Sequence, residues 1–197
     1  MTTYSFPAVT PTSSTVELLS NTATFQSPIT GTVQSVDRGG ERWRITLQYM
    51  NLKNADRAVM QAFLARLNGQ QHRFTLHNHD EPQRGVLSGT PLVAGASQTG
   101  VTLNIDGVGT VSDWIMAGDW FSVNGELKMA VLDANSSGGA ATLTFVPRLR
   151  EAPADNAAVT VSSGTGTFIL DGNSVSWSNR PGGFSDLSFS AIEDIAA

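Results

Sequence analysis

The sequence predicts a mainly β protein with one α-helix: a β-sandwich domain into which a small β-barrel or β-sandwich domain is inserted. Two observations lead to this fold class. Short segments in which apolar and polar residues alternate recur along the 197 residues, and glycine-rich turns separate them. A single stretch, residues 55–67, instead repeats its apolar residues with the spacing of a helix.

The clearest strand begins near Glu41 and alternates strictly. One face is apolar and the other polar, which predicts one buried and one exposed side: Trp43, Ile45, Leu47 and Tyr49 against Arg42, Arg44, Thr46 and Gln48. Residues 31–36 are expected to pair with this strand through a tight turn at Asp37–Gly40. The first 28 residues contain three prolines and little alternation, which predicts an extended arm or an edge strand.

The helix, about residues 55–67, has marked limits. Asn54 is expected to cap its N-terminus, and Asn68–Gly69 supplies a left-handed stop. Three apolar residues at i, i+4 and i+8 form a stripe that is expected to be buried on the sheet: Val59, Phe63 and Leu67. A second strand, residues 71–78, follows, with Phe74 and Leu76 on its apolar face.

From residue 89 onward, short alternating strands follow one another without a helix, which predicts a small barrel or sandwich. Pro147 and Pro153 are expected to keep their segment out of a central strand. The last strands could complete either module, and we favour their return to the first sheet. Residues 1–86 and 167–197 then form one domain, and residues 89–165 form an inserted domain that can be removed without unfolding the first.

Composition excludes several classes of function. The chain has no cysteine, so a disulfide framework, a zinc-thiolate site and a cysteine nucleophile are impossible. Its 12 Lys and Arg against 17 Asp and Glu give a net charge of -5, which disfavours binding to nucleic acid phosphates. The sequence shows neither a signal peptide nor an apolar run long enough to span a membrane. We therefore expect a soluble protein made in a cytoplasm.

Few residues suggest chemistry. His77 and His79, two apart on a strand, point the same way and are a weak candidate for a divalent metal, with Asp80 or Glu81 as a further ligand. A solvated strand end explains them more simply, so no metal is expected. No nucleophile elbow, phosphate loop or dinucleotide fingerprint is present. We expect no catalytic residue and no cofactor, and hence no enzyme.

Two sets of side chains suggest contacts with other molecules. Trp114 and Trp120 could stack on a sugar if exposed, although such tryptophans more often belong to a core or an interface. Four arginines are candidates for a contact with a neighbouring subunit, and a solvated surface is the alternative: Arg42, Arg44, Arg148 and Arg150.

Two stretches together resemble a known family. The first is the helix AVMQAFLARLNG with the strand HRFTL, within residues 58–76, and the second is AGDWFSVNGELKMAVLDANSSGGAATLTFVPRLR, residues 117–150. This chain is similar in both to the distal tail proteins of long-tailed, siphovirus-type bacteriophages. The similarity lies in pattern and order and covers most of the chain.

The resemblance implies a structural virion protein at the tail tip, assembled in the host cytoplasm. In that family about six copies form a ring that joins the tail tube to the baseplate hub. The implied partners are further copies of the chain, the tail tube, hub and tape-measure proteins, and tail fibre or receptor-binding proteins. DNA passes through such a ring without specific binding, and no catalytic residue carries over. The alternatives are a carbohydrate-binding or adhesin-like module and a tail-tube or tube-completion protein.

Overall fold

The computed structural model describes residues 1–79 and 83–195 and is mainly β, with one helix in that part of the chain. One of its sheets is nearly closed and barrel-like. The first sheet has the order β1-β6-β15-β17-β5-β2, with β16 also paired to β17. Its strands are β1 (Thr3–Ser5), β2 (Ser13–Leu19), β5 (Arg42–Leu52), β6 (Arg73–His77), β15 (Thr165–Leu170), β16 (Ser176–Arg180) and β17 (Phe184–Glu193).

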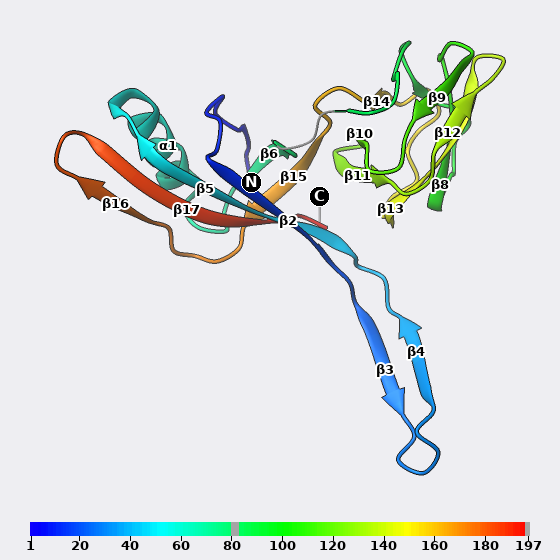
Figure 1. Cartoon of the computed structure of the whole chain (residues 1–197), viewed down its shortest axis with the longest axis horizontal. Coiled ribbons are helices and arrows are strands. Elements are labelled where there is room, and N and C mark those ends of the chain that lie inside the picture. Colours follow the sequence, from blue (N-terminus) through cyan, green and yellow to red (C-terminus); the bar gives the residue numbers. More distant parts are fainter. Residues whose placement is uncertain (80–82, 196–197) are drawn as a thin grey trace.

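The second sheet, of order β14-β10-β11-β13-β8-β7, lies between β6 and β15 in the sequence. Its strands are β7 (Leu92–Val93), β8 (Gly100–Asp106), β10 (Trp120–Val123), β11 (Glu126–Ala130), β13 (Ala140–Leu149) and β14 (Val159–Thr160). Two strand pairs complete the fold: β9 (Val111–Ile115) with β12 (Ala134–Ser136), and β3 (Thr22–Gln26) with β4 (Val33–Asp37). Figure 1 shows the two sheets side by side, with the β3–β4 hairpin standing away from both.

The strand β5 lies inside the first sheet, between β2 and β17, and its two faces are those that the alternation predicts. Trp43, Ile45, Leu47 and Tyr49 are buried, and the intervening side chains are partly or fully exposed. The strands after the second sheet return to the first, since β17 pairs with both β5 and β15. Residues 13–19 form an edge strand, as expected.

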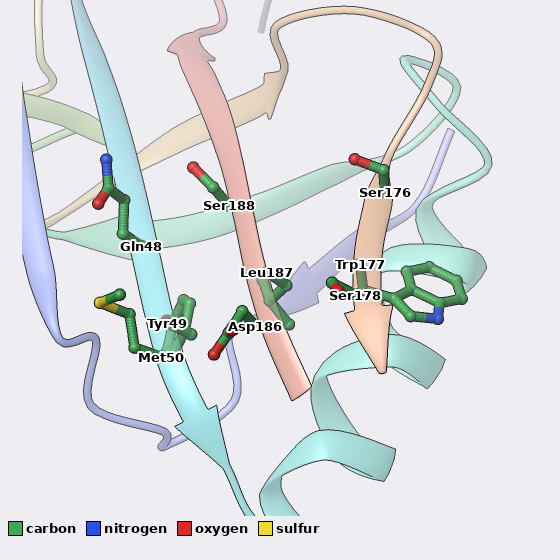
Figure 2. A pocket seen from close by; sticks show the side chains of 9 residues that line it. All are labelled: Gln48, Tyr49, Met50, Ser176, Trp177, Ser178, Asp186, Leu187 and Ser188. Carbon is green, nitrogen blue, oxygen red and sulfur yellow. The ribbon is translucent and has the colours of Figure 1, made fainter. Parts of the chain in front are cut away.

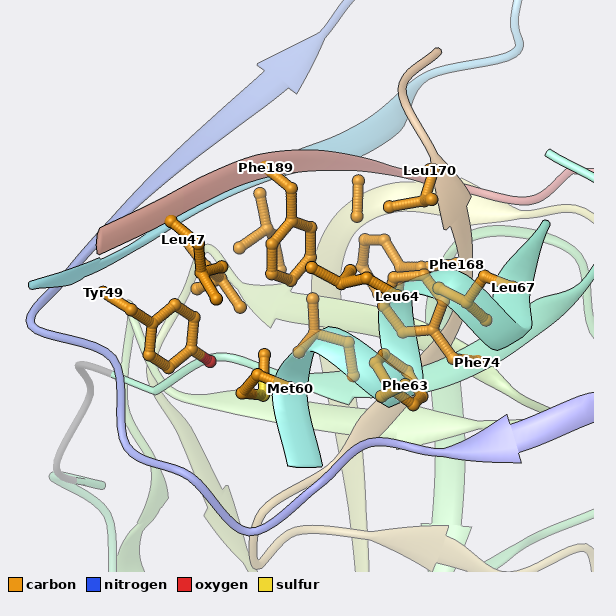
Figure 3. Close-up of a cluster of buried hydrophobic side chains, with 14 of the residues drawn as sticks. Leu47, Tyr49, Met60, Phe63, Leu64, Leu67, Phe74, Phe168, Leu170 and Phe189 are labelled. Carbon is orange, nitrogen blue, oxygen red and sulfur yellow. The ribbon is translucent and has the colours of Figure 1, made fainter. Parts of the chain in front are cut away.

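The helix α1 (Asn54–Leu67) covers the apolar face of the first sheet (Figure 3). Its buried residues are Met60, Phe63, Leu64 and Leu67. Two expectations were wrong. Val59 is 49% exposed, because the contact stripe follows positions 60, 63, 64 and 67, and position 59 lies outside it. Lys53 occupies the N-cap position without a side-chain hydrogen bond, and Asn54 is the first helical residue.

Asp37–Gly40 is not a tight turn, because β4 pairs with β3 rather than with β5. The chain reverses earlier, where the Ser27 N–H donates to the Thr32 carbonyl over 2.9 Å. Gly39 and Gly40 have φ of 68° and 79° and form a joint between the β2–β5 and β3–β4 pairs. Glycine permits positive φ in a joint as readily as in a turn, so the sequence signal was ambiguous.

Pro147 lies within β13, a central strand, which corrects a further expectation. The pairing of β13 with β8 shifts register between Thr144 and Leu149. A proline that lies in such an irregularity does not remove a hydrogen bond from the regular ladder. The strand therefore continues through a residue that normally confines strands to the edge.

The two modules share part of one core. Each sheet has its own hydrophobic cluster, but Trp120 and Leu127 of the second sheet belong to the cluster of the first. Trp43 and Trp120 lie with ring centroids 4.6 Å apart, and the Trp43 indole N–H donates to the Leu127 carbonyl over 3.0 Å. The expectation that the second module can be removed without harm to the first is therefore not supported.

Candidate assembly surface

The β3–β4 hairpin, residues 22–37, is an arm without packing partners of its own. Every residue of its two strands is exposed except Ala23, which is partly buried. Figure 1 shows it projecting from the end of the β2–β5 pair, away from both sheets. An isolated two-stranded hairpin is at best marginally stable in water, so an exposed arm of this kind is suited to contact another molecule.

The register of the arm separates an apolar face from a polar one. Ala23 is opposite Val36 and Phe25 is opposite Gln34, and directly opposed residues share a face. Phe25 is 64% exposed and Val36 is 62% exposed. The other face carries Thr22, Thr24, Gln26, Val33, Ser35 and Asp37. The arm thus presents one mainly apolar, uncovered face.

The arm is also free of charge over most of its length. Residues 22–36 contain no Asp, Glu, Lys or Arg, although charged residues make up 15% of the chain. A solvated hairpin gains from charges, which keep it soluble and block unwanted pairing. Depletion of charge together with an exposed aromatic residue is instead typical of the centre of a protein interface.

Arg148 holds the base of the arm from the second module. Its guanidinium forms an ion pair with Asp37 at the end of β4 and lies 3.8 Å from the Glu41 carboxylate. The Asn21 side-chain amide donates to the Gly39 carbonyl over 3.0 Å at the same joint. Arg148 was a candidate for a contact with another subunit, and its carboxylate partners lie in its own chain.

The outer face of the first sheet, opposite the helix, carries a shallow groove of about 430 Å³ where β5, β17 and β16 run side by side (Figure 2). It is lined by Gln48, Tyr49, Met50, Ser176, Trp177, Ser178, Asp186, Leu187 and Ser188. Tyr49 and Leu187 direct their side chains into the core, whereas Met50 is 59% exposed. Trp177 is opposite Leu187 and therefore lies on the helix side of β16. Met50 is thus the apolar side chain on the outer face of this groove, and Trp177, 38% exposed, meets solvent on the helix side.

Arg42 and Arg44 lie on the polar face of β5, as the alternation predicts. Arg44 contacts two carboxylates of its own chain, Glu17 at 3.3 Å and Asp171 at 2.9 Å. The expectation that Arg44 pairs with carboxylates of a neighbouring subunit is not supported. Arg42 is opposite Leu19, at the end of the β2–β5 pair from which the arm departs.

Arg150 belongs to a buried charged cluster between the sheets rather than to a surface. It contacts Glu193 at 2.5 Å, and Glu193 is fully buried. The ammonium group of Lys128, also fully buried, donates to Glu126 over 2.5 Å and to the Arg148 carbonyl over 2.9 Å. Burial lowers the pKa of Lys128, and Glu126 opposes that shift. Lys128 is buried because both faces of β11 are covered, with only Met129 partly exposed.

Trp114 and Trp120 are both buried, which overturns the sugar-stacking prediction. Trp114 is fully buried, and its indole N–H donates to the Ser88 carbonyl over 2.8 Å. Trp120 is 6% exposed and packs on Trp43. A stacking platform needs an accessible ring face, which neither side chain offers.

His77 and His79 come together, with ring centroids 4.1 Å apart, beside a pocket of about 360 Å³ that the N-terminal segment also lines. Burial lowers the pKa of His77. The proposed further ligands, Asp80 and Glu81, lie outside the described residues. Among residues 1–79 and 83–195, no group of three or more His, Asp or Glu side chains is arranged to hold a metal ion.

No protein-family model matches the chain, and no curated protein matches it. Within the part of the chain that the structure describes, no helix has the length and apolarity that crossing a membrane requires. Sequence reasoning missed the projecting hairpin of residues 22–37, because it placed residues 31–36 beside β5 and expected an extended arm or an edge strand before residue 28. Its signal was present in the sequence as a run of fifteen uncharged residues, 22–36, that contains Phe25 and Ile29.

Proposed function

We propose that this protein is a structural component that assembles with copies of itself into a ring, as the distal tail protein at the tail tip of a long-tailed bacteriophage. The observation that carries the proposal is the exposed, uncharged arm. The two sheets have cores of their own, so the body does not need the arm for folding. A segment that costs solubility and adds nothing to the core is explained by a contact between molecules.

The ring and its place in the virion come from the family resemblance. In that role the ring joins the tail tube to the hub, with tape-measure and fibre proteins as further neighbours. The charge of the chain suits a channel for DNA, because six copies at -5 each carry about -30 and repel phosphates. The buried positions of Trp114 and Trp120 leave the alternative of a carbohydrate-binding module without support.

The proposal is tested by deleting the arm. Residues 22–37 are replaced by Asn-Gly, a pair that favours a two-residue hairpin turn, between Asn21 and Arg38. Native mass measurement and negative-stain images are compared for the wild type and this variant. We expect rings of about six wild-type subunits, and a variant that remains monomeric and still unfolds in a single cooperative thermal transition.

Three outcomes count against the proposal. A wild-type protein that stays monomeric at high concentration contradicts self-assembly itself. A variant that still forms rings contradicts the role of the arm. Wild-type rings that stack into long tubes indicate the tail-tube alternative, which shares the ring but continues to polymerise.

A further inference from the structure

We propose that the apolar face of the arm docks on the outer face of the first sheet of a second copy, in the groove beside Met50. This inference rests on the proposed self-assembly and names the surface that receives the arm. It pairs Phe25 and Val36 of one copy with Met50 and its serine-rich surroundings on the next.

The arm cannot reach this groove within its own chain. Met50 lies near the far end of β5, eight residues beyond Arg42, and Phe25 is opposite Gln34, eight residues before Arg42. At about 3.3 Å per residue, Phe25 and Met50 are separated by roughly 50 Å along the ribbon. Figure 1 shows the arm extending away from the sheet rather than folding back over it. An arm that docks in this groove must therefore come from another molecule.

The groove matches the arm in charge. Its outer-face side chains are uncharged except Asp186, whose carboxylate accepts the Asn51 N–H over 2.8 Å and contacts Arg180 at 2.6 Å. The copies each carry a net charge of -5, so a contact between two uncharged surfaces avoids the repulsion that other surfaces would meet. An uncharged arm would gain nothing from a charged site.

The groove also matches the arm in shape. Ser176, Ser178 and Ser188 have short side chains, which allow a two-stranded ribbon to approach the sheet closely. Met50 is flexible and 59% exposed, and methionine sulfur makes favourable contacts with aromatic rings. A Phe25 ring beside Met50 would cover the two exposed apolar side chains at once.

The positions of the two surfaces determine the type of assembly. The arm leaves one end of the β2–β5 pair and the groove lies toward the other, so each copy gives one arm and receives one. Such a head-to-tail contact is heterologous, and it produces a closed ring or an open filament rather than a two-fold dimer. The inference therefore agrees with the ring of the proposed function.

Disulfide trapping tests the contact directly, because the chain contains no cysteine. Phe25→Cys and Met50→Cys are prepared separately, mixed as full-length proteins and oxidised. A bridge requires Cα atoms within about 7 Å, so it reports close contact. We expect a covalent dimer in the mixture and none in either variant alone. The matched control is Gln26→Cys mixed with Met50→Cys, since Gln26 lies on the opposite face of the arm.

A second variant tests the same contact without a covalent bond. Met50→Glu places a charge in the groove on an exposed position and is expected to raise the apparent dissociation constant of the ring at least tenfold while the monomer stays folded. Native mass is measured on the same samples. Rings without the Phe25–Met50 bridge overturn the docking surface and leave the proposed function standing. A bridge formed equally well by Gln26 overturns the assigned face, and monomers throughout overturn both proposals.

Discussion

Arg150 of the second module forms a buried ion pair with Glu193 of the first sheet, with the guanidinium 2.5 Å from the carboxylate. Glu193 also accepts the Leu127 N–H over 2.9 Å, so one carboxylate links β17 to β11 and to the segment after β13. Such a pair adds little net stability when complete, because both groups have lost water, but breaking it leaves a buried charge uncompensated. It therefore fixes how the two modules sit together.

Loss of one partner in this pair is expected to destabilise the protein strongly. Arg150→Ala leaves Glu193 buried without its cation, at a cost of about 3 to 5 kcal/mol in the free energy of unfolding. Urea denaturation of wild type and variant at the same protein concentration measures this loss of stability. Arg180→Ala is the matched control, because the Arg180–Asp186 pair is largely exposed and is worth under ~1 kcal/mol. Equal effects of the two substitutions would show that Arg150 does not hold the interface.

Removal of the second module is expected to unfold the first. A short Gly-Ser linker in place of residues 89–165 deletes Trp120 and Leu127 from the first core and strips Glu193 of Arg150 and the Leu127 N–H. The variant should lose cooperative thermal unfolding by near-UV circular dichroism. A cooperative transition close to that of the wild type would mean that the shared core contributes little.

Phe63 and Val59 lie on the same helix, but their replacement by alanine is expected to change the free energy of unfolding very differently. Phe63 is 8% exposed and packs edge-on against Phe6 and Phe74, so Phe63→Ala should cost about 3 to 5 kcal/mol. Val59 is 49% exposed, and Val59→Ala should change stability by less than about 0.5 kcal/mol, since alanine also favours the helix. Chemical denaturation of the two variants and the wild type measures both changes in the free energy of unfolding. A loss under about 1 kcal/mol for Phe63→Ala would contradict the burial of this helix face.

The ionisation of Asp186 is expected to make the free energy of unfolding depend on pH at low pH. The N–H of Asn51, and then Arg180, lower the pKa of Asp186 below its ordinary 3.8. A carboxylate with a lowered folded pKa stabilises the protein fully above its unfolded pKa, and the contribution disappears as pH falls through the folded value. Asp186→Asn should therefore be less stable than wild type at pH 7, with the difference shrinking below about pH 3.8. A constant difference across a denaturation series from pH 2 to 7 would be inconsistent with this cause.

Much of the body was predictable because its signals are local. The alternation from Trp43 to Tyr49 identified the buried face of β5, and the helix lies within two residues of its expected limits. The mainly β fold class followed from repeated short alternating segments and is confirmed. These features depend on residues that are near one another in the sequence, where periodicity carries the information.

The errors arose where distant contacts decide the outcome. The sequence left open whether Trp114 lies in a core or on a surface, because it does not show that the distant Ser88 carbonyl accepts the indole N–H inside a closed core. The sequence alone leaves Arg44 free to contact a neighbouring subunit, because only the fold brings Asp171, distant in the chain, to 2.9 Å from its guanidinium. The joint at Gly39 was mistaken for a turn because its conformation depends on the pairing of Asn21 across the ribbon.

A ribosome makes β5 long before it makes β17, and the whole second module emerges between them. Thr46 and Ser190, which share a hydrogen bond in the sheet, are 144 residues apart. At ~5–20 residues per second, β5 waits roughly 7 to 30 s for its central neighbour, with only β2 beside it. The second sheet, whose strands are close in sequence, can fold during that interval. The nascent chain thus exposes one unpaired edge of β5 near the uncharged, exposed hairpin. We therefore predict that slow synthesis or crowding of polysomes favours aggregation over assembly.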